Sequence, residues 1–197
     1  DALPEGPVAT IDGRYKLLGG ATTRGWEKFQ GRFDLTAEPN EPFRFGWVVE
    51  IDPYDPLSMP RKRTALGRFF HKGATTALAA DGRAVVYMGD DAVFEHMYKF
   101  VSRRGLRGTD KGSLLDEGTL FAARLHPDGT AEWPPLVHGE GPLVAENGFE
   151  SQADVLLDAR GAAALVGATR MDRPEDIERN PVTGAVYAVL TNNAKRE

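Results

Sequence analysis

Short β-prone runs recur along this chain, some alternating between apolar and polar residues and some continuously apolar. The 22 glycines and 13 prolines are distributed between the runs rather than clustered, as in a sheet-rich protein with many tight turns. The pattern predicts strands at residues 46–51, 74–79, 84–88, 96–101, 119–125, 131–136, 177–179 and 185–191. We therefore predict an all-β protein in which helix is the minority.

Turn motifs separate these β-prone runs in pairs. The motifs are Asp12-Gly13, Asp81-Gly82, Asp128-Gly129 and the segment of residues 180–184. They recur at intervals of roughly 50 to 70 residues, which suits consecutive blades of a repeat architecture. We predict β-propeller-like antiparallel meanders.

One helix is predicted, at residues 151–166. Ser151 is a suitable N-cap and Asp154 lies in the first turn, although Gly161 weakens the pattern. The apolar residues near helical spacing are Val155, Leu156, Ala159, Ala163 and Val166. By contrast, residues 103–117 are polar and carry four basic residues, which predicts a long exposed loop.

The composition is that of an ordinary soluble globular domain, since 41% of the 197 residues are hydrophobic and 27% are charged. We expect a single domain over residues 1–197. The net charge of −5 argues against a nucleic-acid surface, because phosphate backbones are held by clustered Lys and Arg. The basic run Arg61-Lys62-Arg63 is too short to overturn this.

The absence of cysteine excludes disulfides and thiolate metal sites. No apolar run approaches the ~20 residues that span a bilayer. The N-terminal residues have no signal-peptide character. We expect either a cytosolic protein or a chain that begins after an export signal.

Acidic residues follow two predicted strands, Glu50 and Asp52 after one, and Asp90 and Asp91 after another. Hard cations such as calcium need about six to eight oxygen ligands, which loop ends around a propeller axis can supply. The whole oxygen pool is Glu50, Asp52, Asp90, Asp91, Asp172, Glu175, Asp176, Asn192 and Asn193. For each member, the alternative is a solvated turn residue or a cap.

Residues 169–193 place carboxylates and a guanidinium directly ahead of a predicted hairpin. Asp172, Arg173, Glu175 and Asp176 lie at its beginning. A carboxylate beside a guanidinium is either a surface ion pair or part of a site for an anion. The histidines lack metal-ligand spacing and are predicted to be structural: His71, His96, His126 and His138.

Four segments, residues 45–53, 62–69, 86–91 and 169–193, together resemble the PhoX family of alkaline phosphatases. The similarity runs from about Asp34 to the C-terminus. It implies a β-propeller that hydrolyses phosphomonoester small molecules, holds calcium and iron at the propeller axis and is exported to the bacterial periplasm.

The triplet Arg173-Pro174-Glu175 matches a family signature in which the Glu ligates metal and the Arg contacts phosphate. The resemblance therefore implies Arg173 as the catalytic residue. The candidate metal ligands are Glu175, Asp90, Asp91, Glu50 and Asn192. Metal ions and an Arg fork suit the charge that phosphoryl transfer places on the non-bridging oxygens.

The chain departs from the family at two points. After His71 the family has a metal-site Glu, whereas this chain has Lys72, and the family's iron-ligating Cys is absent. A cation in place of a cation's ligand lowers metal affinity. We therefore expect weak calcium binding and little or no phosphatase activity from this chain alone.

Length also shapes the expectation, because a closed propeller needs at least four blades of about 40 to 50 residues each. We expect an interior portion of a larger propeller that self-associates or pairs with missing segments. Two alternative functions stay open. One is a catalytically incompetent binding or structural module, and the other is a calcium-dependent propeller hydrolase of lactone or organophosphate type.

Overall fold

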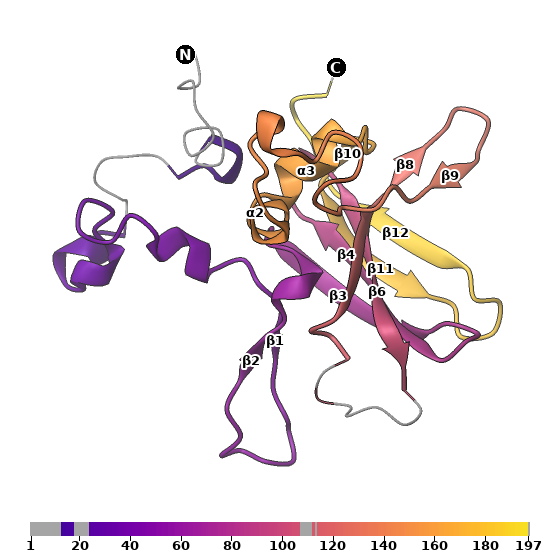
Figure 1. Ribbon diagram of the computed structural model, residues 1–197, viewed down its shortest axis with the longest axis horizontal. Helices are drawn as coiled ribbons and strands as arrows, with labels where there is room; N and C mark the ends of the chain where they lie inside the picture. The colour runs from indigo at the N-terminus through magenta and orange to yellow at the C-terminus, as the bar shows by residue number, and fades with distance from the viewer. Residues whose placement is uncertain (1–12, 18–23, 107–111, 113, 197) are drawn as a thin grey trace. The chain divides into compact units, whose positions relative to one another are not determined.

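The computed structural model describes residues 13–17, 24–106, 112 and 114–196 (Figure 1). The chain divides into two compact units, Asp1–Gly46 and Trp47–Glu197. The predicted Asp12-Gly13 turn lies outside the described residues, because Asp12 does. The single domain over residues 1–197 stays a prediction.

The first unit is built from short 3₁₀ helices: η1 Trp26–Lys28, η2 Gly31–Phe33 and η3 Glu41–Arg44. The rings of Trp26 and Phe33 pack with their centroids 5.5 Å apart. The Glu41 carboxylate is buried and forms ion pairs with Arg32 and with Arg44. Aromatic packing and one buried carboxylate thus hold a unit that has no strand among its described residues.

The second unit centres on a four-stranded antiparallel sheet in the order β3-β4-β6-β7. Its strands are β3 His71–Leu78, β4 Arg83–Asp90, β6 Met97–Gly105 and β7 Gly118–Ala122. The predicted Asp81-Gly82 turn joins β3 to β4, with Gly82 at a φ of 82° that favours glycine. An antiparallel meander in sequence order confirms the all-β class.

A separate hairpin packs against β3 and β4. It consists of β11 Pro174–Arg179 and β12 Val186–Leu190, which follow one another in yellow tones in Figure 1. The predicted turn joins them, because the Asn180 side-chain oxygen accepts hydrogen bonds from the backbone of Val182 and Thr183. Just before β11, β10 Met171–Asp172 pairs with β5 Val93–Glu95.

The predicted helix at residues 151–166 is two helices, α2 Gln152–Leu157 and α3 Ala159–Leu165. Ser151 caps α2, as predicted. The prediction of one helix is wrong because Asp158 leaves the helical conformation and its carboxylate accepts a hydrogen bond from Gly161 N, which caps α3. A second N-cap in mid-segment therefore starts a new helix.

The core of this unit lies between the sheet and the helices. Its buried side chains include Leu66, Phe69, Val86, Met88, Tyr98, Phe100, Leu120, Leu136, Leu143, Phe149, Val155 and Ala159. The inward residues of β4, β6 and β7 pack there against α2 and α3, and burial of apolar surface is what stabilises the arrangement. The core fixes β4 and α3, which carry two of the charged residues described below.

Two predicted strands are shorter in the structure. Residues 46–51 form only β1 Val49–Glu50, paired with β2 Arg61–Lys62, so the predicted strand is shortened to two residues, and Ile51 is exposed. Within residues 131–136, β9 Ala131–Glu132 pairs with β8 Arg124–Leu125, and Pro135 makes an isolated bridge to Phe121 of β7. The pairing with β7 goes no further as a strand because Pro134 and Pro135 lack the N–H groups that a ladder needs.

The predicted loop at residues 103–117 begins three residues later than expected, since β6 continues to Gly105. Leu114 at the other end is buried. Residues 107–111 and 113 lie outside the described part.

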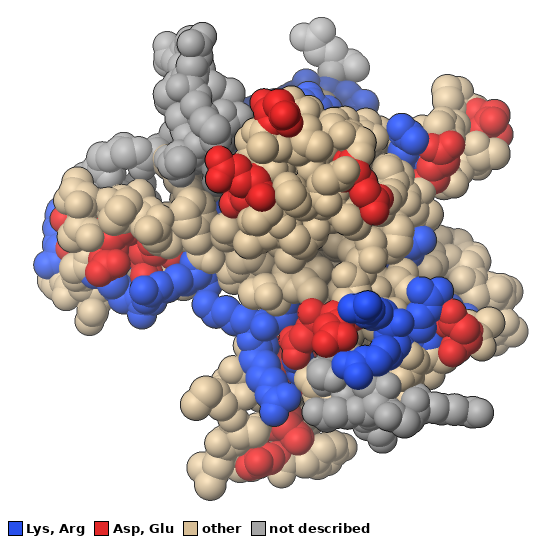
Figure 2. Space-filling view, viewed as in Figure 1, with Lys and Arg blue, Asp and Glu red and all other residues tan. Residues whose placement is uncertain are grey.

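Charged side chains of both signs meet on the surface. The lower part of the face in Figure 2 shows basic residues directly beside acidic ones. Arg104 and Glu117 form an ion pair, with Nη2 and Oε2 3.3 Å apart. Among the described residues, no helix is long and apolar enough to cross a membrane.

Candidate functional site

Asp91 and Arg173 form the first pair of the candidate site. Asp91 follows β4, and Arg173 lies between β10 and β11. Arg173 Nε and Nη2 donate to the two oxygens of Asp91, at 3.0 and 3.3 Å. A two-point contact of this kind fixes the plane of the guanidinium as well as its position.

The backbone of Arg173 is in the left-handed region, with φ at 51°. A non-glycine residue there costs of order 1 kcal/mol or more, and such residues cluster at functional sites. Pro174 follows immediately and begins β11. The conformation turns the chain between two strands and brings the guanidinium to Asp91.

Lys72 completes the arrangement from β3. Its Nζ lies 3.4 Å from Glu175 Oε1 and 3.7 Å from Asp91 Oδ2. We call Lys72, Asp91, Arg173 and Glu175 the charged cluster. It holds two cations and two carboxylates and is therefore formally neutral.

Two β-bulges aim side chains into the charged cluster. Between the pairs His71–Asp90 and Ala74–Met88, β3 has two residues, Lys72 and Gly73, where β4 has one. Likewise, Glu175 is the extra residue between Pro174 and Asp176, whose partners on β12 are consecutive. Bulges redirect side chains and are common beside active sites.

Two glycines let β11 approach the sheet closely. A Cβ on Gly89 of β4 would lie 2.6 Å from the carbonyl oxygen of Pro174, and one on Gly73 would lie 2.8 Å from Asp176 Oδ1. Both distances are shorter than side-chain atoms tolerate. The contact at Gly89 is with the backbone of the residue that follows Arg173, so the missing side chain there sets how closely β11 approaches, whereas the contact at Gly73 is with a side-chain oxygen.

A buried ion pair lies next to the charged cluster. Asp90, which is fully buried, accepts hydrogen bonds from Arg160 Nε and Nη2 at 2.7 and 2.6 Å. Asp90 also accepts from Phe70 N, and Glu95 lies 3.7 Å from Arg160 Nε. Asp90 is therefore satisfied within the protein, in contact with α3 rather than with solvent.

Sequence reasoning missed Arg160. It is a single charged residue in a small apolar stretch of α3, Ala159-Arg160-Gly161-Ala162-Ala163. A charge in such a stretch is rarely buried without a partner. That rule is a signal that could have identified it, although not its partner.

The remaining predicted oxygen ligands lie in other contacts. Glu50 pairs with the buried Arg63, which also binds Asp116. Asp172 binds Arg196 and Asn193, and the hydrogen bond from Arg196 lowers the pKa of Asp172. The other contacts are Asp52 with Tyr54 N, and Asp176 with Ile177 N; Asn192 is exposed.

His71 and His96 make hydrogen bonds to backbone oxygens, as residues with a structural role do. His71 Nε2 lies 3.0 Å from Gly67 O, and its ring stacks on Phe69 with 3.7 Å between centroids. Burial lowers the pKa of His71 to about 4. His96 Nδ1 lies 2.9 Å from Thr169 O, and burial lowers its pKa as well.

The residues present do not fit the metal centre that the resemblance implies. Across residues 13–17, 24–106, 112 and 114–196, no three His, Asp or Glu side chains come together in a group able to hold a metal ion. The two carboxylates that do approach each other, Asp91 and Glu175, share the Lys72 ammonium. The assignment of Glu175, Asp90, Asp91, Glu50 and Asn192 to metals stays a prediction.

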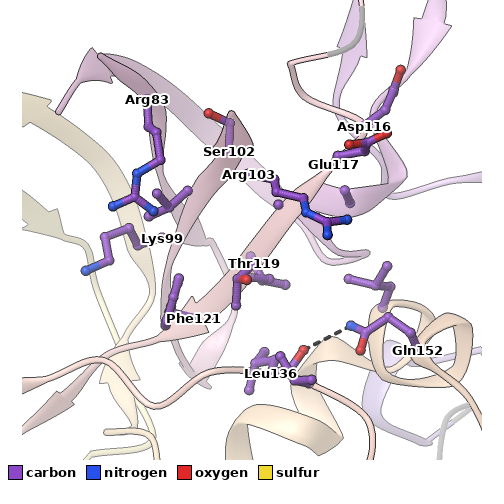
Figure 3. Close-up of a pocket in the computed structure, with 16 residues that line it drawn as sticks. Arg83, Lys99, Ser102, Arg103, Asp116, Glu117, Thr119, Phe121, Leu136 and Gln152 are labelled. Atoms are coloured by element: carbon purple, nitrogen blue, oxygen red, sulfur yellow. Dashed lines mark hydrogen bonds between the residues drawn. The ribbon is translucent and has the colours of Figure 1, made fainter. Parts of the chain in front are cut away.

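A pocket of about 800 Å³ lies elsewhere, along β6 and β7 (Figure 3). Arg83, Lys99 and Arg103 line it, together with Asp116 and Glu117. Lys99 Nζ lies 4.3 Å from the ring centroid of Trp133, and burial lowers the pKa of Lys99. No residue of the charged cluster lines this pocket, so the pocket is separate from the candidate site.

Comparisons with known proteins agree with the resemblance. Residues 5–197 match the family model described as alkaline phosphatase PhoX. A similar solved structure is Pseudomonas fluorescens PhoX in complex with vanadate, a transition state analogue, at 50% sequence identity and a TM-score of 0.87. The match covers 94% of this chain and 34% of that chain, so this chain spans about a third of that protein. No curated protein matches the chain. The chain belongs to the PhoX family of alkaline phosphatases.

Proposed function

We propose that the protein hydrolyses phosphomonoesters and that Arg173 contacts the phosphoryl group. The observation that carries the proposal is the orientation of the Arg173 guanidinium, which binds Asp91 through Nε and Nη2. A guanidinium has five N–H donors, and this contact uses two of them. The side chain is about one-third exposed, at 35%, so further donors are accessible to an anion.

The chemistry of phosphoryl transfer suits this arrangement. Negative charge spreads over the non-bridging oxygens in the transition state, and an oriented Arg stabilises it without reorganising. Asp91 holds the guanidinium in one plane, so it acts as a positioning residue. The Pseudomonas fluorescens structure, in which a vanadate transition state analogue is bound, supports the proposal at 50% identity.

The cofactors, the location and the full activity are proposed for the whole protein. Calcium and iron, and export to the periplasm, follow from the family resemblance. No step of the proposed chemistry is assigned to either metal, because the described residues do not fit a metal centre. This chain spans 34% of its solved relative, so turnover is expected of a longer protein.

Vanadate binding tests the proposal. Arg173→Ala removes the charged donor, and charge-assisted hydrogen bonds contribute about 1.5 to 3 kcal/mol, so the affinity for orthovanadate falls about 10- to 100-fold. Arg179→Ala, on the exposed end of β11, is the matched control and leaves the affinity unchanged. Titration calorimetry measures both. Equal affinities for Arg173→Ala and the unchanged chain contradict the proposal.

A binding module without catalysis is the second candidate. The observation that favours it is the position of Lys72 between two carboxylates that a metal ion would otherwise bridge. Vanadate binding without turnover of an aryl phosphate by the longer protein supports this candidate. Turnover supports the phosphatase. The lactone or organophosphate alternative gains no support from the family match.

A further inference from the structure

Lys72 stands where a bound cation would stand. Its ammonium faces two carboxylates that come from different parts of the chain, Asp91 after β4 and Glu175 in β11. Asp91 is mostly buried, with 13% of its side chain exposed, and Glu175 is 33% exposed. Without a cation between them, two carboxylates with so little exposure to solvent would repel each other.

The charges of the cluster are already balanced. Arg173 neutralises Asp91 through two hydrogen bonds, and Lys72 supplies the second positive charge. A divalent cation at the same place would meet the Lys72 ammonium at close range and add two positive charges to a neutral group. Calcium also needs about six to eight oxygen ligands, which two carboxylates cannot supply.

The backbone holds Lys72 in this position. It lies in the bulge of β3, beside Gly73, whose missing side chain admits Asp176 of β11. The bulge of β11 aims Glu175 toward the same point. The side chain of Lys72 is half exposed, at 52%, and its ammonium is turned toward the two carboxylates rather than away from the protein.

We propose that Lys72 serves as a resident cation that bridges Asp91 and Glu175 in place of a divalent metal ion, and so holds Asp91 against Arg173 without metal. This inference concerns the same site as the proposed phosphate contact and rests on it only for the role of Arg173. Lys72 is a positioning residue. The cluster excludes divalent cations while the ammonium is present.

Calcium titration in the absence of any phosphate analogue tests the inference. The unchanged chain and Lys72→Arg, which keeps the charge, bind no calcium at the cluster. Lys72→Glu removes the cation and adds a carboxylate, so it gains measurable calcium binding. Lys195→Met, at an exposed lysine outside the cluster, is the control and behaves as the unchanged chain. Calcium binding of equal strength by the unchanged chain and Lys72→Glu overturns the inference.

A second measurement separates the positioning role from mere stability. Lys72→Met keeps the apolar stem but leaves Asp91 and Glu175 without their shared cation. Its vanadate affinity falls, whereas Lys72→Arg, which keeps the charge, retains the affinity of the unchanged chain. Undiminished vanadate binding by Lys72→Met, or an equal loss in Lys72→Arg, overturns the role in holding Asp91. Circular dichroism confirms that each variant is folded.

The two proposals fail separately. If Arg173→Ala leaves vanadate binding unchanged, the proposed phosphate contact is wrong, while the calcium titrations still test the resident-cation role of Lys72. If Lys72→Glu gains no calcium affinity, the resident-cation role is wrong, while the vanadate affinity of Arg173→Ala still tests the phosphate contact.

Discussion

Lys72 and Glu175 meet across two sheets, with Nζ 3.4 Å from Oε1, and each is placed there by a bulge in its own strand. A bulge inserts one extra residue into a strand, which interrupts the regular ladder and changes the direction of the side chain at that point. The charged cluster therefore depends on irregular backbone in β3 and β11, supported by the close packing of those strands at Gly73 and Gly89.

Gly89→Ala should displace β11. The added methyl group would lie 2.6 Å from Pro174 O and 3.0 Å from Pro174 C, and the backbone must shift to admit it. Overpacking of this kind costs about 1 to 3 kcal/mol of the free energy of unfolding. Because Pro174 follows Arg173, vanadate affinity should fall as well. Chemical denaturation and calorimetry measure the two effects.

Gly31→Ala is the control for this substitution, since a Cβ there meets nothing within 4 Å. It should leave both the free energy of unfolding and vanadate affinity near their original values. A Gly89→Ala protein as stable as Gly31→Ala would show that β11 does not rest on the glycine.

Removal of one partner of the Asp90–Arg160 pair should strongly lower the free energy of unfolding. Arg160→Met leaves a buried carboxylate without its partner, which lowers the free energy of unfolding by about 3 to 5 kcal/mol. The double variant Asp90→Asn with Arg160→Met should recover part of the loss, because no buried charge remains. Urea denaturation measures both. Equal stability of Arg160→Met and the unchanged chain would contradict the structural role of the pair.

The sequence was sufficient for elements whose signals are local. Asp81-Gly82 and the turn at residues 180–184 lie where predicted, because each residue type matches the φ that its turn requires. Ser151 also caps a helix as predicted. The break at Asp158 was missed, because an Asp inside a helical pattern shows its capping role only once its side chain is placed.

The candidate site was predictable in part. The sequence identified Arg173, Glu175 and Asp91 as site residues and Lys72 as a departure, and the structure brings these four together. Their mutual contacts depend on which strands pack and where bulges occur, and no local pattern encodes either. The long-range partner of Asp90 is Arg160, 70 residues later, which is a tertiary relationship for the same reason.

His71 should make stability depend on pH between about 6.5 and about 4. Burial lowers its pKa in the folded state, so in this window the unfolded chain binds a proton that the folded chain does not. Stability is fully present above 6.5, falls as pH decreases, and stops falling from this source below about 4. The largest loss is about 3 kcal/mol.

His71→Gln should flatten this part of the pH dependence. Denaturation at several pH values between 4 and 7 measures it, and the difference from the unchanged chain isolates His71 from the carboxylates that titrate nearby. His138→Gln, at an exposed histidine, is the control and keeps the original slope. Parallel curves for His71→Gln and the unchanged chain would show that this ring does not titrate as expected.

Self-association should involve the loop between β1 and β2. Three large apolar side chains there are almost fully exposed: Tyr54, Leu57 and Met59. Exposed apolar groups that lie together mark surfaces for other proteins, and a buried Leu contributes about 1.5 to 3 kcal/mol. Leu57→Glu should therefore weaken self-association about tenfold or more by sedimentation equilibrium. Val182→Glu, at an equally exposed residue in the turn between β11 and β12, should have no effect. A chain that stays monomeric at every concentration, or an equal response to both substitutions, would show that this loop is not the contact.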